Sequence, residues 1–180
     1  MVNVAELASR IRSLAPSCGP ARLVAVDGPA GSGKTTLALA LGQELGSQVV
    51  RSDDFPVPWD EGPGAWFPAL ERAVLVPLAA GRTGRFRRYD WVREAYAEVV
   101  TVPPAPVLVI EGVGTARRSI AHLLAWTVWV EAPEPARWRR VAERDGPGLE
   151  RQWRAWFAAE REWFAADGTR ERADEIVTTA

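Results

Sequence analysis

Short apolar runs alternate along this chain with segments of helical periodicity. The runs have the length of buried strands and lie at 23–26, 49–50, 107–110, 127–131 and 175–178. Elsewhere, apolar residues recur every three or four positions, which predicts helices at 4–14, 36–45, 65–80, 119–124, 135–144 and 149–166. Strands that alternate with helices in this way are typical of a parallel sheet covered by helices.

The run at 107–110 is the most continuous of these and is bounded by Pro106 and Gly112, so it predicts a strand buried on both faces. Residues 97–102 predict a short edge strand. Residues 56–64 hold three prolines and two glycines, which favour a loop. A basic segment at 82–88 leads into Tyr89-Asp90-Trp91.

One motif stands where the first strand meets the following helix. Residues 28–35 read Gly-Pro-Ala-Gly-Ser-Gly-Lys-Thr and match the phosphate-binding pattern G-x-x-x-x-G-K-[ST]. Its glycines let successive N–H groups point at one oxyanion, and the helix start adds its positive end. Lys34, the only lysine among 22 basic residues, is expected to reach the outer phosphates of ATP, and the Thr35 hydroxyl to bind Mg²⁺. The expected ATP-binding residues are Gly28, Ala30, Gly31, Ser32, Gly33, Lys34, Thr35 and Thr36.

Acidic residues follow three of the predicted strands. Ligands of open parallel sheets bind beyond the carboxyl ends of the strands, where Asp27, Asp53, Asp54 and Glu111 are expected. Phosphoryl transfer needs a carboxylate for the metal, which suits Glu111 directly or through water. It also needs a group that accepts the proton of the attacking hydroxyl, which suits Asp53 or Asp54 equally. Each of these carboxylates could instead cap a helix or a turn.

Composition narrows the function classes. A chain of 180 residues predicts a single domain over 1–180. The net charge of −1 gives no overall bias toward nucleic acid or an anionic membrane, and the single cysteine, Cys18, allows no internal disulfide. No apolar run approaches the ~20 residues of a membrane span, and the start of the chain lacks signal-peptide features. We therefore expect a cytoplasmic protein whose partner is a small molecule rather than nucleic acid or membrane; the oligomeric state stays open.

These motifs together resemble the uridine kinase and phosphoribulokinase branch of P-loop kinases. The resemblance spans nearly the whole chain in order. It is carried by the phosphate loop with Asp27 and Thr36, Asp53-Asp54-Phe55, Leu75-x-x-Leu78-x-x-Gly81, Tyr89-Asp90-Trp91, the apolar run into Glu111-Gly112, the arginines 137, 140 and 144, and Ala173-Asp174-Glu175-Ile176-Val177.

The resemblance implies a three-layer α/β P-loop NTPase fold, with a five-stranded parallel sheet flanked by helices and a short arginine-rich lid at about 137–150. It implies that Asp53, rather than Asp54, is the base, and that Thr35, Asp53 and Glu111 surround Mg²⁺. It assigns Arg137 to ATP binding and Arg140 and Arg144, with Lys34, to catalysis. Their spacing of three and four places the three arginines on one helical face, although a solvated basic face would show the same spacing.

The acceptor side departs from the resemblance. An acidic, histidine-containing segment of nucleoside kinases is reduced here to residues 60–63, and Glu94 stands where a histidine would follow the tyrosine motif. The expected acceptor-binding residues are Asp60, Arg88, Tyr89 and Asp90. The arginines at 82, 85, 87 and 88 are either solvated or bind an acceptor that carries a phosphate or carboxylate. Trp59 or Trp66 either packs or stacks on an aromatic acceptor.

The sequence thus predicts an ATP- and Mg²⁺-dependent kinase that phosphorylates a hydroxyl of a small metabolite, nucleoside-like by resemblance. Within this class the acceptor could be phosphorylated, carboxylated or an antibiotic. From another class, the chain could be a P-loop ATPase or nucleotide switch that acts on a protein partner.

Overall fold

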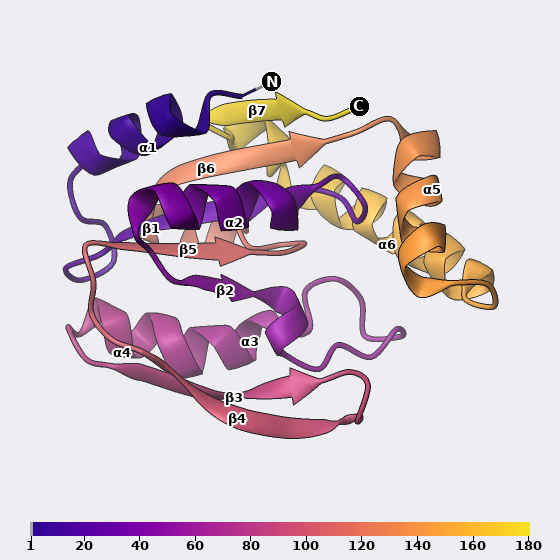
Figure 1. The fold of residues 1–180 in the computed structure, drawn as a ribbon, viewed down its shortest axis with the longest axis horizontal. Coiled ribbons are helices and arrows are strands. Elements are labelled where there is room, and N and C mark those ends of the chain that lie inside the picture. The colour runs from indigo at the N-terminus through magenta and orange to yellow at the C-terminus, as the bar shows by residue number, and fades with distance from the viewer. Residues whose placement is uncertain (1) are drawn as a thin grey trace.

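The central feature of the fold is a five-stranded parallel sheet with strand order β2-β5-β1-β6-β7. The computed structural model describes residues 2–180 (Figure 1). The strands are β1 (Arg22–Asp27), β2 (Val49–Arg51), β5 (Val107–Glu111), β6 (Leu124–Glu131) and β7 (Glu175–Thr178). All four pairings are parallel. The predicted sheet is confirmed, and β5 is buried along its whole length as its apolar run predicts.

Helices cover both faces of the sheet, because β1 is apolar on both. Val24 and Val26 pack on α1 (Val4–Ser13) and α2 (Lys34–Leu45), whereas Leu23 and Ala25 face the helical segment after the 56–64 loop. That segment comprises α3 (Phe67–Leu70), a π-helical turn (Glu71–Leu75) and α4 (Val76–Ala79). The wide turn lies directly before Pro77, which has no N–H to continue a regular α-helix.

The segment predicted as a lid, at about 137–150, falls within α5 (Glu134–Asp145) and the turn that leads to α6 (Glu150–Asp167). These two helices, called the lid helices below, stand together at one side of the sheet (Figure 1). They pack on each other and on the phosphate loop through a small cluster that includes Ala30, Val141, Trp153 and Phe157. Short 3-10 helices, three to six residues long, lie at Ser52–Asp54, Arg118–Leu123 and Arg170–Arg172. No helix within residues 2–180 combines the length and the apolar character that crossing a bilayer requires.

A separate hairpin corrects the sequence prediction at 82–102. The basic segment is a strand, β3 (Gly84–Asp90), and it pairs antiparallel with β4 (Ala95–Val102). The expected strand at 97–102 therefore lies in this hairpin and not at an edge of the main sheet. Arg85, Phe86 and Arg87 alternate with Phe86 buried between two exposed arginines, and the density of charge concealed this period of two.

Candidate active site

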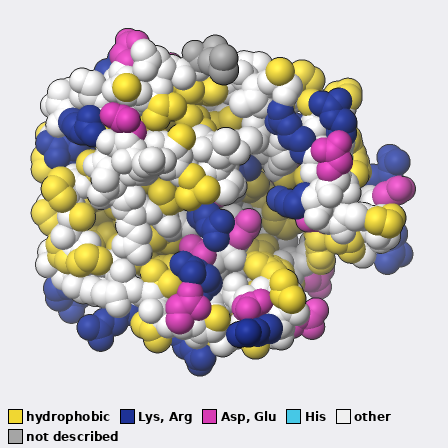
Figure 2. Space-filling model, viewed as in Figure 1, with side chains coloured by type: hydrophobic (Ala, Val, Ile, Leu, Met, Phe, Trp, Pro, Cys, Tyr) yellow, Lys and Arg dark blue, Asp and Glu magenta, His cyan; other side chains and the backbone are white. Residues whose placement is uncertain are grey.

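A cleft of about 990 Å³ opens at the carboxyl ends of β1, β2 and β5. Figure 2 shows the surface hollowed between the lid helices and the hairpin below them. The phosphate loop, the residues after β2, the hairpin turn, α5 and α6 all line it. It brings together six side chains that the sequence assigned to chemistry: Lys34, Thr35, Asp53, Glu111, Arg140 and Arg144.

The phosphate loop is held in shape by close backbone packing. Gly31 and Gly33 have φ of 74° and 96°, a region that side chains disfavour. A Cβ on Gly31 would lie 2.7 Å from the carbonyl oxygen of Arg137, so the loop is pressed against the start of α5. Lys34 is largely buried, and its Nζ donates a hydrogen bond of 3.0 Å to the carbonyl of Pro29. The lysine therefore lies folded over the phosphate loop, and we expect its ammonium group to bind the same phosphates as the N–H groups of the loop.

Thr35 and Glu111 form the contact that the magnesium prediction requires. The Thr35 hydroxyl donates to Glu111 Oε2 at 3.2 Å, although the two residues are far apart in the sequence. Glu111 is buried, and burial raises its pKa to about 7; Lys34 acts in the opposite direction and the charge of Asp53 adds to the rise.

The donor set fits magnesium better than a metal held by protein alone. No group of three or more His, Cys, Asp or Glu side chains in residues 2–180 could hold an ion. Mg²⁺ binds oxygen, and it commonly takes one or two protein ligands while phosphate oxygens and water complete its octahedron. A hydroxyl beside a carboxylate at the phosphate loop meets that requirement.

Asp27, the remaining predicted carboxylate, does not line the cleft. Its side chain is fully buried and accepts hydrogen bonds from the N–H groups of Gly28, Gly114 and Ala116 at 2.7–2.9 Å. Burial raises its pKa to about 6, against the opposing effect of these donors. Asp27 therefore ties the phosphate loop to the segment that follows β5.

The geometry separates Asp53 from Asp54. Asp54 is buried and accepts hydrogen bonds of 3.0 Å from the Arg51 N–H and from Nε of Arg88. Asp53 is exposed and lines the cleft, and its backbone carbonyl accepts a 2.8 Å hydrogen bond from Nε1 of Trp91. Of these two aspartates, only Asp53 has a carboxylate that a ligand in the cleft can reach.

The lid arginines take different positions. Arg140 lines the cleft and donates to the carbonyl of Gly31 at 2.8 Å. Arg144 makes two hydrogen bonds to Asp145, at 2.7 and 2.9 Å. This contact raises the pKa of Arg144 against the opposing effect of burial, and the charges of Asp53 and Glu111 add to the rise. Arg144 lines the same cleft as these two carboxylates.

Arg137 is a correction. The resemblance assigned it to ATP, but it is buried behind the phosphate loop and does not line the cleft. Its Nη1 donates to Glu160 Oε1 at 2.6 Å and to the carbonyl of Ala30 at 3.2 Å. Glu160 Oε2 accepts the N–H of Ala30 at 2.8 Å. The pair therefore clamps the loop from behind.

Sequence reasoning missed Glu160. It is 1% exposed although it carries a charge. Its position in the sequence could have revealed its burial, because it follows Trp153 by seven residues and Phe157 by three, on the apolar face of α6. A carboxylate on such a face needs a buried partner. That partner is Arg137, which the sequence prediction had assigned to ATP instead.

The four predicted acceptor residues lie outside the cleft lining. Arg88 pairs with Asp54 and Glu98, and Asp90 accepts the N–H groups of the two residues that follow Trp91 in the hairpin turn. Tyr89 packs edge-on against Trp91 and Tyr96, with ring centroids 5.0 and 5.6 Å apart. Asp60 is exposed. As placed here, these side chains serve the hairpin and the loop.

Tryptophans, rather than the predicted acceptor residues, line this part of the cleft. The five that line it are Trp59, Trp66, Trp91, Trp153 and Trp156. Trp59 lies edge-on to Trp153 and Trp156, at centroid distances of 4.9 and 5.9 Å, and so joins the 56–64 loop to α6. The sequence singled out Trp59 and Trp66 near the acceptor; it gave no sign that α6 and the hairpin turn would add three more.

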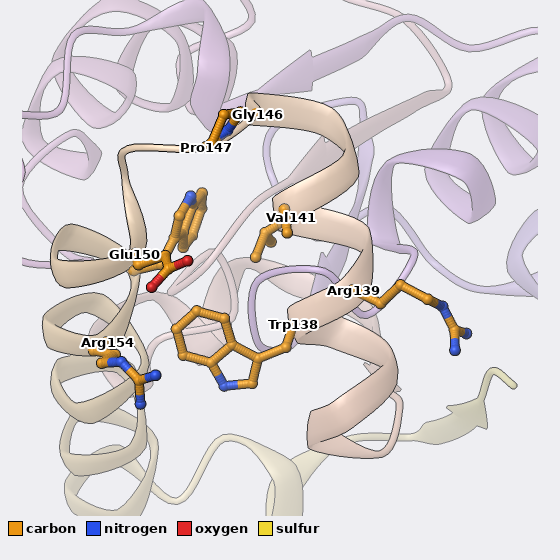
Figure 3. A pocket seen from close by; sticks show the side chains of 9 residues that line it. Trp138, Arg139, Val141, Gly146, Pro147, Glu150 and Arg154 are labelled. Carbon is orange, nitrogen blue, oxygen red and sulfur yellow. The ribbon is translucent and has the colours of Figure 1, made fainter.

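A second cavity, of about 530 Å³, lies between α5 and α6 (Figure 3). Trp138 projects into the space between the two helices, under the guanidinium of Arg154, whereas Arg139 points away from it. Its lining includes no residue of the phosphate loop and neither Asp53 nor Glu111. The predicted chemistry therefore belongs to the larger cleft.

Solved structures confirm the fold. A "possible uridine kinase" from Bacillus stearothermophilus is 20% identical, with a TM-score of 0.68 over 97% of this chain and 96% of its own. A protein of Silicibacter sp. TM1040, provisionally described as a fructose transport system kinase, is 21% identical, with a TM-score of 0.75 over 98% and 99% of the two chains. At these identities the likeness establishes the fold and not the activity.

Comparison of the sequence with known proteins finds only partial matches. No family model matches the chain. A tRNA dimethylallyltransferase of Myxococcus xanthus is 31% identical over 106 residues, which are 56% of this chain. The matched stretch spans only 34% of that relative's length.

Proposed function

We propose that this protein is a small-molecule kinase that transfers the terminal phosphate of ATP to a hydroxyl group with the help of Mg²⁺. The observation that carries the proposal is the 3.2 Å contact between the Thr35 hydroxyl and Glu111, beside Lys34 and in one cleft with Asp53. A nucleotide switch needs the phosphate loop and the metal contact, but it has no use for an open carboxylate that faces them. By resemblance, the acceptor is a nucleoside or a related alcohol.

Each residue has a defined part in this reaction. Lys34 and the loop N–H groups bind the phosphates, and Thr35 and Glu111 would hold Mg²⁺, with Asp53 beside them. The metal, when bound, neutralises charge on the outer phosphates. Asp53 orients the acceptor hydroxyl and takes its proton. Arg140 and Arg144 offset the charge that develops during transfer, which is where such groups contribute most to rate.

An acceptor screen tests this proposal. The purified protein is incubated with ATP and Mg²⁺, hydroxylated metabolites are added singly, and ADP release and the phosphorylated product are measured. We expect slow release alone, a large rise with a suitable acceptor, and loss of the rise with excess chelator. Release that no small molecule changes would instead favour an ATPase or switch that acts on a protein.

Lys34→Ala provides the matched test of the phosphate loop. It should weaken ATP binding, measured by titration calorimetry, and abolish transfer, because the loop loses its one cationic side chain. Arg82→Ala removes an exposed positive charge outside the cleft and should change neither quantity. Unchanged ATP affinity in Lys34→Ala would contradict the assignment of the loop.

A further inference from the structure

The acceptor side of the cleft is apolar. Two segments flank Asp53 here: residues 55–66, which follow the 3-10 turn at Ser52–Asp54, and the turn of the β3–β4 hairpin. Every side chain that they contribute to the lining is uncharged and apolar: Val57, Trp59, Pro63, Trp66, Trp91 and Val92. The charged lining residues belong instead to the phosphate loop, the strand ends and the lid.

This apolar wall is anchored at the reacting groups. Nε1 of Trp91 donates to the backbone carbonyl of Asp53 at 2.8 Å, and Nε1 of Trp66 donates to the carbonyl of Val113, two residues after Glu111, at 3.1 Å. The indoles therefore adjoin the segments that carry the base and the metal-side carboxylate. A molecule whose hydroxyl meets Asp53 must place its body against them.

Part of the wall lies uncovered. Trp91 is 49% exposed, Val92 is 95% exposed and Trp59 is 42% exposed, while Trp66 is buried behind them. Exposed indole and isopropyl surface gains free energy when a ligand removes it from water. These side chains line the cleft, where a bound molecule can cover them.

The arginines of β2 and β3 near the apolar wall are engaged in other contacts. Arg88 pairs with Asp54 and Glu98, and Arg87 donates to the carbonyls of Tyr96 and Ala97. Neither lines the cleft. Arg51 does, but its guanidinium lies 3.6 Å from the buried carboxylate of Asp54, whose charge it balances. The other cations of the lining, Lys34, Arg140 and Arg144, belong to the phosphate loop and α5 and are assigned to the transferred phosphate. A carboxylate or phosphate on the acceptor would therefore meet a wall that contributes no cation.

We propose that the acceptor is an uncharged alcohol built on a flat ring, and that the ring lies against Trp91. This inference rests on the proposed kinase function and defines its substrate class. The acceptor oxygen forms a bond to the terminal phosphorus while the bond from that phosphorus to the bridging oxygen breaks. ADP leaves with the electron pair, and the hydroxyl proton passes to Asp53. Trp91 both contacts the ring and holds the Asp53 backbone, so it determines specificity and position together.

A panel of neutral and acidic alcohols tests the substrate class. The neutral probes are uridine, pyridoxine and 2-phenylethanol, and the acidic probes are uridine monophosphate, shikimate, glycerate and 3-phenyllactate. We expect kcat/KM for the best neutral probe to exceed that for every acidic probe at least tenfold. Preference for an acidic probe would overturn the inference and leave the kinase function standing. If none is phosphorylated although ATP binds, the kinase function fails and the inference falls with it.

Substitutions of Trp91 test its position, with the best acceptor as substrate. Trp91→Ala should raise KM for the acceptor about tenfold, the scale of one lost aromatic contact, and leave ATP affinity within twofold. Trp91→Phe keeps a ring but loses the hydrogen bond to Asp53, so KM should largely recover while kcat stays low. Val99→Ala, an exposed residue on β4, should change neither constant. An unchanged KM in Trp91→Ala, with an unchanged melting temperature, would refute the inference.

Discussion

Asp53 and Asp54 show how neighbours of identical chemistry acquire different roles. Both lie in the 3-10 turn that follows β2, which directs consecutive side chains in different directions. Asp54 points inward to the N–H of Arg51 and the guanidinium of Arg88, and Asp53 points into the cleft. The sequence could not separate them because Arg88 lies 34 residues away, and only the fold brings it to Asp54.

We predict that the two Asp→Asn substitutions have opposite signatures. Asp53→Asn should lower turnover about 100-fold or more, the usual effect of losing a general base, with ATP affinity and melting temperature nearly unchanged. Asp54→Asn should instead lower the free energy of unfolding by about 1–3 kcal/mol, because a buried acceptor of charged hydrogen bonds is weakened. Steady-state kinetics and urea unfolding measure both. Loss of turnover in Asp54→Asn alone, at full stability, would reverse the assignment.

At the scale of elements, the lid is joined to the phosphate loop by a buried ion pair. Arg137 on α5 and Glu160 on α6 bind each other and both backbone groups of Ala30. The lid helices therefore cannot move as a unit without disturbing the loop that binds phosphate. Burial raises the pKa of Glu160, while the Ala30 N–H, Lys34 and Arg137 favour its charged form.

We predict that Glu160→Gln weakens both the fold and nucleotide binding. It leaves the buried Arg137 guanidinium with only the partly exposed Glu134 carboxylate, 3.8 Å away, as a counter-charge. Breaking a buried pair typically costs about 3–5 kcal/mol. Urea unfolding should register that loss, and calorimetry well below the melting temperature should show ATP affinity reduced several-fold. Glu162→Gln changes an exposed carboxylate on the same helix and serves as the control. Equal stability and ATP affinity in the two variants would show that the pair does not support the loop.

For the whole molecule, the sequence predicted what depends on local pattern. Short apolar runs defined the five parallel strands, and the phosphate loop followed from its spacing. The hairpin was missed because alternating arginines on β3 concealed its one buried phenylalanine. The predicted acceptor residues, which were carried over from the resemblance, lie outside the cleft lining. Which side chains line a cleft depends on packing between distant segments, as Trp59 and α6 show.

The last residue of α6, Asp167, joins the end of this helix to two other segments of the chain. Asp167 accepts hydrogen bonds from the Arg118 N–H at 2.9 Å, the Thr169 hydroxyl at 2.6 Å and the Arg172 guanidinium at 2.5 Å. Burial alone would raise its pKa, but these donors outweigh burial and lower the pKa below its ordinary value of 3.8. In the folded state Asp167 therefore holds its proton less tightly than in the unfolded chain.

This difference predicts how stability depends on pH. Because the unfolded state binds more protons, the contribution of Asp167 is complete above the ordinary pKa of 3.8 and disappears as pH falls through the lowered folded pKa. Asp167→Asn should cost about 1–2 kcal/mol of unfolding free energy near pH 7, the scale of charged hydrogen bonds, and progressively less toward pH 3. Urea unfolding of both proteins over pH 3–7 measures this, with exposed Glu171→Gln as the control. A difference that stayed constant down to pH 3 would mean that Asp167 does not stabilise the fold through its charge.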